Sequence, residues 1–120
     1  MIVEDLTLIK SVGKGSFGEV FLASKKGVQE NFAVKKVSKS MVESPKVRKY
    51  FNNEILILKQ VNHPNIIKLH DTKQTLNNYY LVFDLYAHDG NIYAIFKLLF
   101  AFSFISIKTS SSIYLPLFLI

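Results

Sequence analysis

A chain of 120 residues without cysteine has room for one small domain, and it excludes disulfide bonds as the source of that domain's stability. The net charge of +6 comes from lysines spread along the chain, not from a basic arm, and this distribution argues against a nucleic-acid partner. Acidic Glu4 and Asp5 stand where a secretion signal would need a basic segment and a long apolar run, so we expect a cytoplasmic protein.

Three glycines with the spacing G-x-G-x-x-G mark residues 13–20, where the sequence reads Gly-Lys-Gly-Ser-Phe-Gly-Glu-Val. Glycines at this spacing let the backbone turn tightly beside a bulky anion. A strand is predicted on each side, at 6–12 and 19–23, whereas a helix follows the same spacing in dinucleotide-binding folds. We therefore expect an antiparallel hairpin that covers a nucleotide as a flap, with an ordinary glycine-rich turn as the alternative.

A third strand is predicted at 32–37, after a polar connection over 24–31. Side chains two residues apart share a face of a strand, so Ala33, Lys35 and Val37 point to one side. A small apolar residue suits adenine, and a flexible cation suits phosphates. The alternative is that Lys35 is an ordinary lysine facing solvent.

A helix is predicted from Ser44 and Pro45, a typical N-cap and first-turn pair, to about Gln60. Its apolar residues recur at helical spacing and form one face, which comprises Val47, Phe51, Ile55 and Leu58. Glu54 lies beside this face. A carboxylate that faces a core is costly unless a cation meets it, and Lys35 is the candidate, although a solvent-exposed Glu54 is the alternative.

Two further strands are predicted at 66–71 and 79–84, joined by a polar turn that contains Asn77 and Asn78. The sequence thus predicts an α+β fold in which one helix packs on a five-stranded antiparallel sheet. The irregular segment 85–90 follows the last strand, and its backbone could offer hydrogen bonds to a flat heterocycle.

These features, in this order, closely resemble the N-terminal lobe of the eukaryotic protein kinases, of the serine/threonine type. The resemblance covers residues 4–96. Its motifs are the glycine loop, the triplet Ala33-Val34-Lys35, the helix glutamate Glu54, the turn at 63–65 (His-Pro-Asn), and the run at 80–84 (Tyr-Leu-Val-Phe-Asp). The combination at these spacings is specific to that family.

The resemblance implies a site for ATP. The glycine loop would cover the phosphates through Gly13, Lys14, Gly15, Ser16, Phe17 and Gly18. Val20 and Ala33 would close over adenine, and Lys35, kept in place by Glu54, would hold the α- and β-phosphates. Phe83 would be the bulky residue beside the adenine pocket, and the backbones of Asp84 and Tyr86 would bind the adenine edge.

Phosphoryl transfer in this family also needs the motifs H-R-D-x-x-x-x-N and D-F-G, and the sequence contains neither. No Asp or Glu follows Asp89, and the pair His70-Asp71 lies in a predicted strand. We therefore expect a truncated serine/threonine kinase domain that binds Mg-ATP but has no catalytic residue or metal ligand, and that meets a protein substrate only if a C-terminal lobe exists. A non-catalytic module that binds a nucleotide or a partner is the alternative.

The segment 97–120 is apolar and does not resemble a kinase. We expect a helical tail that arises from a truncated or misread C-terminus. Residues 92–120 are also considered as a membrane attachment, because a span needs about 20 mostly apolar residues. That alternative would require Lys97 to lie near an interface and would make the protein membrane-associated.

Overall fold

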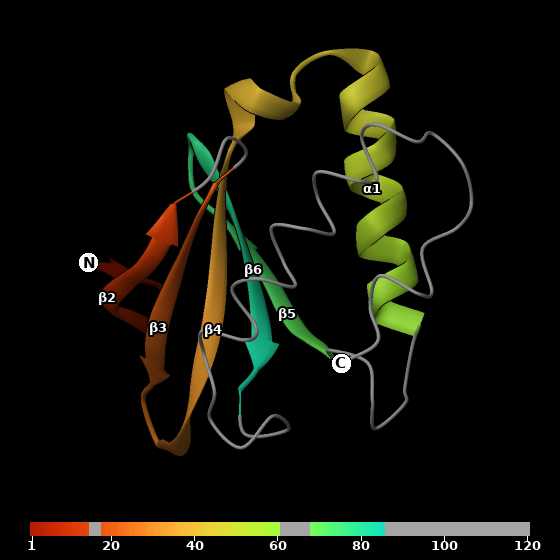
Figure 1. Ribbon diagram of the computed structural model, residues 1–120. Helices are drawn as coiled ribbons and strands as arrows, with labels where there is room; N and C mark the ends of the chain where they lie inside the picture. Colours follow the sequence, from red (N-terminus) through yellow and green to blue (C-terminus); the bar gives the residue numbers. More distant parts are fainter. Residues whose placement is uncertain (15–17, 61–67, 86–120) are drawn as a thin grey trace.

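The computed structural model describes residues 1–14, 18–60 and 68–85. Within these residues, six strands, a short 3-10 helix and one α-helix follow one another (Figure 1). They are β1 (Ile2–Val3), β2 (Leu6–Lys14), β3 (Glu19–Lys25), β4 (Val28–Ser38), η1 (Lys39–Val42), α1 (Pro45–Gln60), β5 (Leu69–Gln74) and β6 (Asn78–Asp84).

All six strands join one antiparallel sheet in the order β1-β2-β3-β4-β6-β5. The helix α1 lies on one side of this sheet, near β5 and β6 (Figure 1). The α+β class and the single packed helix were predicted, but the expected count of five strands was wrong. The additional strand, β1, has only two residues and turns back through Glu4 and Asp5 to pair with β2, so it is too short to show an alternating pattern.

The central strand β6 and the second half of β4, from Phe32 on, are largely buried on both faces of the sheet. Residues 79–83 of β6 read as a nearly continuous apolar run because alternate side chains enter two separate clusters. The cluster on the helix side contains Val20, Ala33, Val37, Phe51, Leu58, Leu81 and Phe83 among others. The cluster on the opposite face contains Val3, Leu6, Leu8, Ala23, Phe32, Val34, Tyr80 and Val82.

Helix α1 begins where the sequence predicts. The backbone N–H of Val47 donates a hydrogen bond of 3.2 Å to the Ser44 Oγ, and Pro45 occupies the first helical position, where its missing N–H costs nothing. Phe51 and Leu58 are buried, and Val47 and Ile55 pack beside them. The predicted apolar face of the helix is therefore confirmed.

The strand predicted at 66–71 is present in part as β5. Residues 66 and 67 lie outside the described residues, and β5 runs from Leu69 to Gln74, past the predicted end at 71. The polar residues of its second half pair with β6 and make side-chain contacts. Gln74, for example, accepts a hydrogen bond of 2.8 Å from the Lys39 Nζ. The predicted polar connection over 24–31 is likewise shorter, since β3 and β4 extend to a two-residue turn that ends at Gly27, with φ of 81°.

The sheet curls until its two ends meet at Lys73. The Lys73 Nζ, on β5 at one end of the sheet, lies 3.2 Å from Asp5 and 3.8 Å from Glu4 in the turn after β1, at the other end. Burial acts to lower the pKa of Lys73, but its hydrogen bonds to Asp5 and Asp71 outweigh that effect and raise the pKa. This closure covers the face of the sheet that α1 does not reach.

Several sequence predictions fall on residues 15–17, 61–67 and 86–120, which lie outside the described residues. They include the middle of the glycine loop, the turn at 63–65, and the apolar helical tail. Within residues 1–14, 18–60 and 68–85, no helix is both long and apolar enough to cross a membrane.

Candidate functional site

Lys35 lies in the middle of the sheet, on the face that α1 covers. Its position on β4 pairs with Val20 of β3 on one side and with Leu81 of β6 on the other. Only 3% of the residue is exposed. Ala33, two positions earlier, is fully buried and pairs with Phe83 in the same way, so the side chains predicted to share a face do share it.

Glu54 brings a negative charge to this lysine from α1. The residue is 6% exposed, so it faces the core as predicted, and the alternative of a solvent-exposed glutamate is excluded. Burial lowers the pKa of Lys35 from 10.5 to about 8, while the charge of Glu54 acts in the opposite direction. The sheet and the helix thus place a buried cation and a buried carboxylate where their charges interact.

The glycine hairpin is formed by the ends of β2 and β3. Gly13 pairs with Val20, and Lys14 pairs with Glu19, so the predicted antiparallel arrangement is present on both sides of the turn. Gly15, Ser16 and Phe17 lie outside the described residues.

Gly18 has a structural requirement that the sequence did not reveal. A Cβ atom placed on Gly18 would overlap the backbone carbonyl oxygen of Lys36 on β4. Gly18 therefore lets the hairpin approach β4 closely, and this requirement is independent of any contact with phosphates.

At the end of β6, Phe83 is fully buried in the cluster on the helix side, and the Asp84 N–H donates a hydrogen bond of 3.2 Å to the Lys68 carbonyl. Tyr86 lies outside the described residues. The sequence did not predict that His70 contacts Asp84, with 3.1 Å between the His70 Nδ1 and the Asp84 Oδ1. Only the register of β5 against β6 could have indicated this pair.

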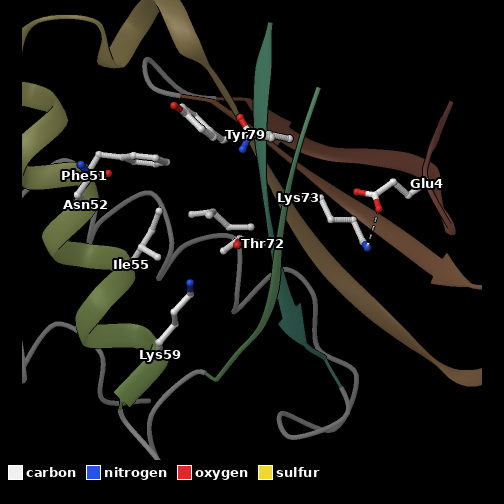
Figure 2. Close-up of a pocket in the computed structure, with 10 residues that line it drawn as sticks. Glu4, Phe51, Asn52, Ile55, Lys59, Thr72, Lys73 and Tyr79 are labelled. Atoms are coloured by element: carbon white, nitrogen blue, oxygen red, sulfur yellow. Dashed lines mark ion pairs between the residues drawn. The ribbon is translucent and has the colours of Figure 1, made fainter. Parts of the chain in front are cut away.

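A cavity of about 380 Å³ opens between α1 and the strands β5 and β6, as Figure 2 shows. Its lining combines apolar and polar side chains and consists of Glu4, Phe51, Asn52, Ile55, Lys59, Thr72, Lys73, Gln74, Tyr79 and Leu81. Among the described residues, none that is predicted to bind ATP belongs to this lining. The cavity is therefore separate from the described part of the predicted nucleotide site, and no single stretch of sequence could have indicated it.

An antiparallel sheet with one helix packed against it, and with a buried lysine and glutamate between them, is consistent with the N-terminal lobe of a protein kinase. The family model described as "Protein kinase domain" matches residues 6–114. The chain belongs to the protein kinase family, and it corresponds to an N-terminal portion of the kinase domain.

Among curated proteins, the chain is similar to Calcium-dependent protein kinase 4 of Plasmodium berghei, with 40% identity over 79 residues. It is 37% identical over 93 residues to 3-phosphoinositide-dependent protein kinase B of Dictyostelium discoideum, and 37% identical over 90 residues to Serine/threonine-protein kinase Sgk1 of Gallus gallus. These alignments cover 66%, 78% and 74% of this chain, but only 15%, 10% and 21% of the three relatives.

Proposed function

We propose that this chain binds ATP between its sheet and its glycine hairpin, and that Lys35 holds the α- and β-phosphates. The observation that carries the proposal is the burial of Lys35 beside Glu54. A lysine whose pKa has fallen to about 8 retains a cost of burial that one carboxylate does not offset. A triphosphate would bring several further negative charges to the same cation and would stabilise its protonated form.

The remaining contacts follow from the position of this lysine. Val20 and Ala33 would contact adenine, because both side chains lie on the same face of the sheet as Lys35 and present no polar group. The hairpin that includes Gly13 and Gly18 would lie over the phosphates. The backbone at Asp84 and Tyr86 would bind the adenine edge, next to Phe83.

The proposal is limited to binding for these 120 residues. The sequence contains neither H-R-D-x-x-x-x-N nor D-F-G, which supply the base and the metal ligands in this family. In a longer protein that carries those motifs, we propose transfer of the ATP γ-phosphate to serine or threonine hydroxyls of a protein substrate. The similarity to Serine/threonine-protein kinase Sgk1 of Gallus gallus supports that substrate class.

Proton uptake provides a specific test. If bound phosphates raise the pKa of Lys35, ATP binding near pH 8 will take up protons, and the apparent enthalpy in titration calorimetry will change with the ionisation enthalpy of the buffer. Titrations of the full chain with ATP, with and without Mg²⁺, should show this dependence. Lys35→Met should weaken binding and remove the proton uptake.

Lys36→Met is the matched control, because it removes the same charge from the next residue of β4, whose side chain points to the opposite face. This variant should bind ATP as the wild-type chain does. Failure of the wild-type chain to bind ATP, or equal binding by the wild type and Lys35→Met, would refute the proposal.

A further inference from the structure

We propose that His70 is a positioning residue for adenine recognition, because it fixes the backbone at the end of β6 through the carboxylate of Asp84. The inference rests on the proposed ATP site. It adds a residue on β5 that is not among the residues predicted from the sequence to bind ATP. His70 would not touch the nucleotide. It would hold the segment whose backbone does.

Asp84 is a buried carboxylate at the point where the predicted adenine-binding segment begins. Its side chain is 7% exposed, and the Asp84 Oδ1 lies 3.1 Å from the His70 Nδ1. A buried carboxylate is costly without a hydrogen-bond donor, and the ring nitrogen of His70 meets this requirement. The contact therefore stabilises one position of the Asp84 side chain.

His70 is itself held in place by an aromatic contact. Its ring lies 5.0 Å from the ring of Phe32, measured between centroids, with an angle of 42° between the two planes. Phe32 is also the residue of β4 that pairs with Asp84. Phe32, His70 and Asp84 thus form a cluster in which each residue is a neighbour of the other two.

An irregularity in β5 makes this contact possible. Leu69 pairs with Phe83 and Asp71 pairs with Val82, so that His70 is the one extra residue of a β-bulge. A bulge changes the direction of a side chain relative to regular alternation. Here it lets His70 face Asp84 while Leu69 keeps its place in the cluster on the helix side.

Asp84 is consequently restrained in three ways. Its backbone pairs with Phe32, its N–H donates to the Lys68 carbonyl over 3.2 Å, and its carboxylate meets His70. Backbone groups bind a flat heterocycle more tightly when their orientation is fixed before binding. Loss of the His70 contact should therefore affect the base of the nucleotide and leave its phosphates unaffected.

The test separates the two ends of ATP by using three probes with the full chain: ATP, adenosine and inorganic tripolyphosphate. His70→Ala should weaken ATP and adenosine binding about tenfold, and leave tripolyphosphate binding unchanged. Lys35→Met should show the opposite pattern, with weaker ATP and tripolyphosphate binding and unchanged adenosine binding. Gln74→Ala, a polar change elsewhere on β5, should bind all three probes as the wild type does.

Two conservative variants keep the test decisive if His70→Ala does not fold. In His70→Asn the side-chain nitrogen is attached to Cγ, as Nδ1 is in histidine, so this variant should restore adenosine binding. In His70→Gln the nitrogen is one bond further away, so this variant should bind adenosine as weakly as His70→Ala. A role in stability alone would lower the unfolding temperature without separating adenosine from tripolyphosphate.

The inference is overturned if His70→Gln and His70→Asn bind adenosine equally well, or if His70→Ala weakens all three probes to the same extent. The proposed ATP site is refuted by different results: the wild-type chain does not bind ATP, or Lys35→Met binds ATP and tripolyphosphate as tightly as the wild type does. The response to Lys35→Met therefore distinguishes the two failures.

Discussion

The burial of Lys35 predicts that the stability of the fold rises with pH above neutrality. The pKa of this lysine is 10.5 in an exposed setting and about 8 in the folded chain. Between these two values the unfolded chain holds a proton that the folded chain has released, so raising the pH favours folding. The full difference corresponds to about 3 kcal/mol, of which about 2 kcal/mol is gained between about pH 7 and about pH 9.5.

The measurement compares the wild type with Lys35→Met, which cannot titrate at this position. Urea unfolding of both chains should be followed at the two pH values, and the free energy of unfolding of the variant should be subtracted from that of the wild type. The tyrosines and other lysines are common to both chains and cancel in the difference. Lys36→Met serves as the control for loss of a lysine charge elsewhere.

The expected result is a difference that increases by about 2 kcal/mol at the higher pH. A difference that stays constant would mean that Lys35 titrates alike in the folded and unfolded chains. A difference that falls would mean that the Glu54 charge outweighs burial. Either result would refute the physical basis of the proposed phosphate site.

Three further predictions concern stability. Gly18→Ala should destabilise the fold by about 1–3 kcal/mol in urea unfolding even without a nucleotide, because the added Cβ overlaps the Lys36 carbonyl; an unchanged stability would show that the hairpin shifts freely. Ser44→Ala should cost about 1 kcal/mol through loss of the N-cap of α1, whereas Ser44→Asp should preserve the stability, and equal stabilities of the two variants would exclude the capping role. Lys73→Met should lower the unfolding temperature at low salt, and its deficit should shrink at about 0.5 M salt, since Asp5 is partly exposed and its attraction to Lys73 is screened; a deficit independent of salt would contradict an ionic origin.

Much of the sheet could be predicted because the local pattern of apolar residues indicates the same strands that pair in the folded sheet. The apolar runs of β4 and β6 and the capped, amphipathic α1 each carry a signal within a few residues. The common face of Ala33 and Lys35 follows from strand alternation alone. The burial of Glu54 could be predicted because the helical period places it beside the apolar stripe.

The parts that were missed depend on residues distant in the sequence. The second half of β5 is polar, and only its pairing with β6 and the ion pairs of Lys73 make it a strand. The pairing of His70 with Asp84 depends on a bulge, whose position is set by register and not by composition. The close approach of Gly18 to β4 likewise exists only in the folded sheet.

The ion pairs of Lys73 also bear on how copies of this chain behave toward one another. The strand at the edge of a sheet presents unpaired backbone groups that a second chain can bind as an added strand. At one edge of this sheet β1 is only two residues long, and at the other the turn containing Glu4 and Asp5 is drawn against Lys73. Short edge strands and edge lysines both oppose such pairing. Within the described residues, the contact that closes the sheet thus also opposes association of copies through these two strand edges.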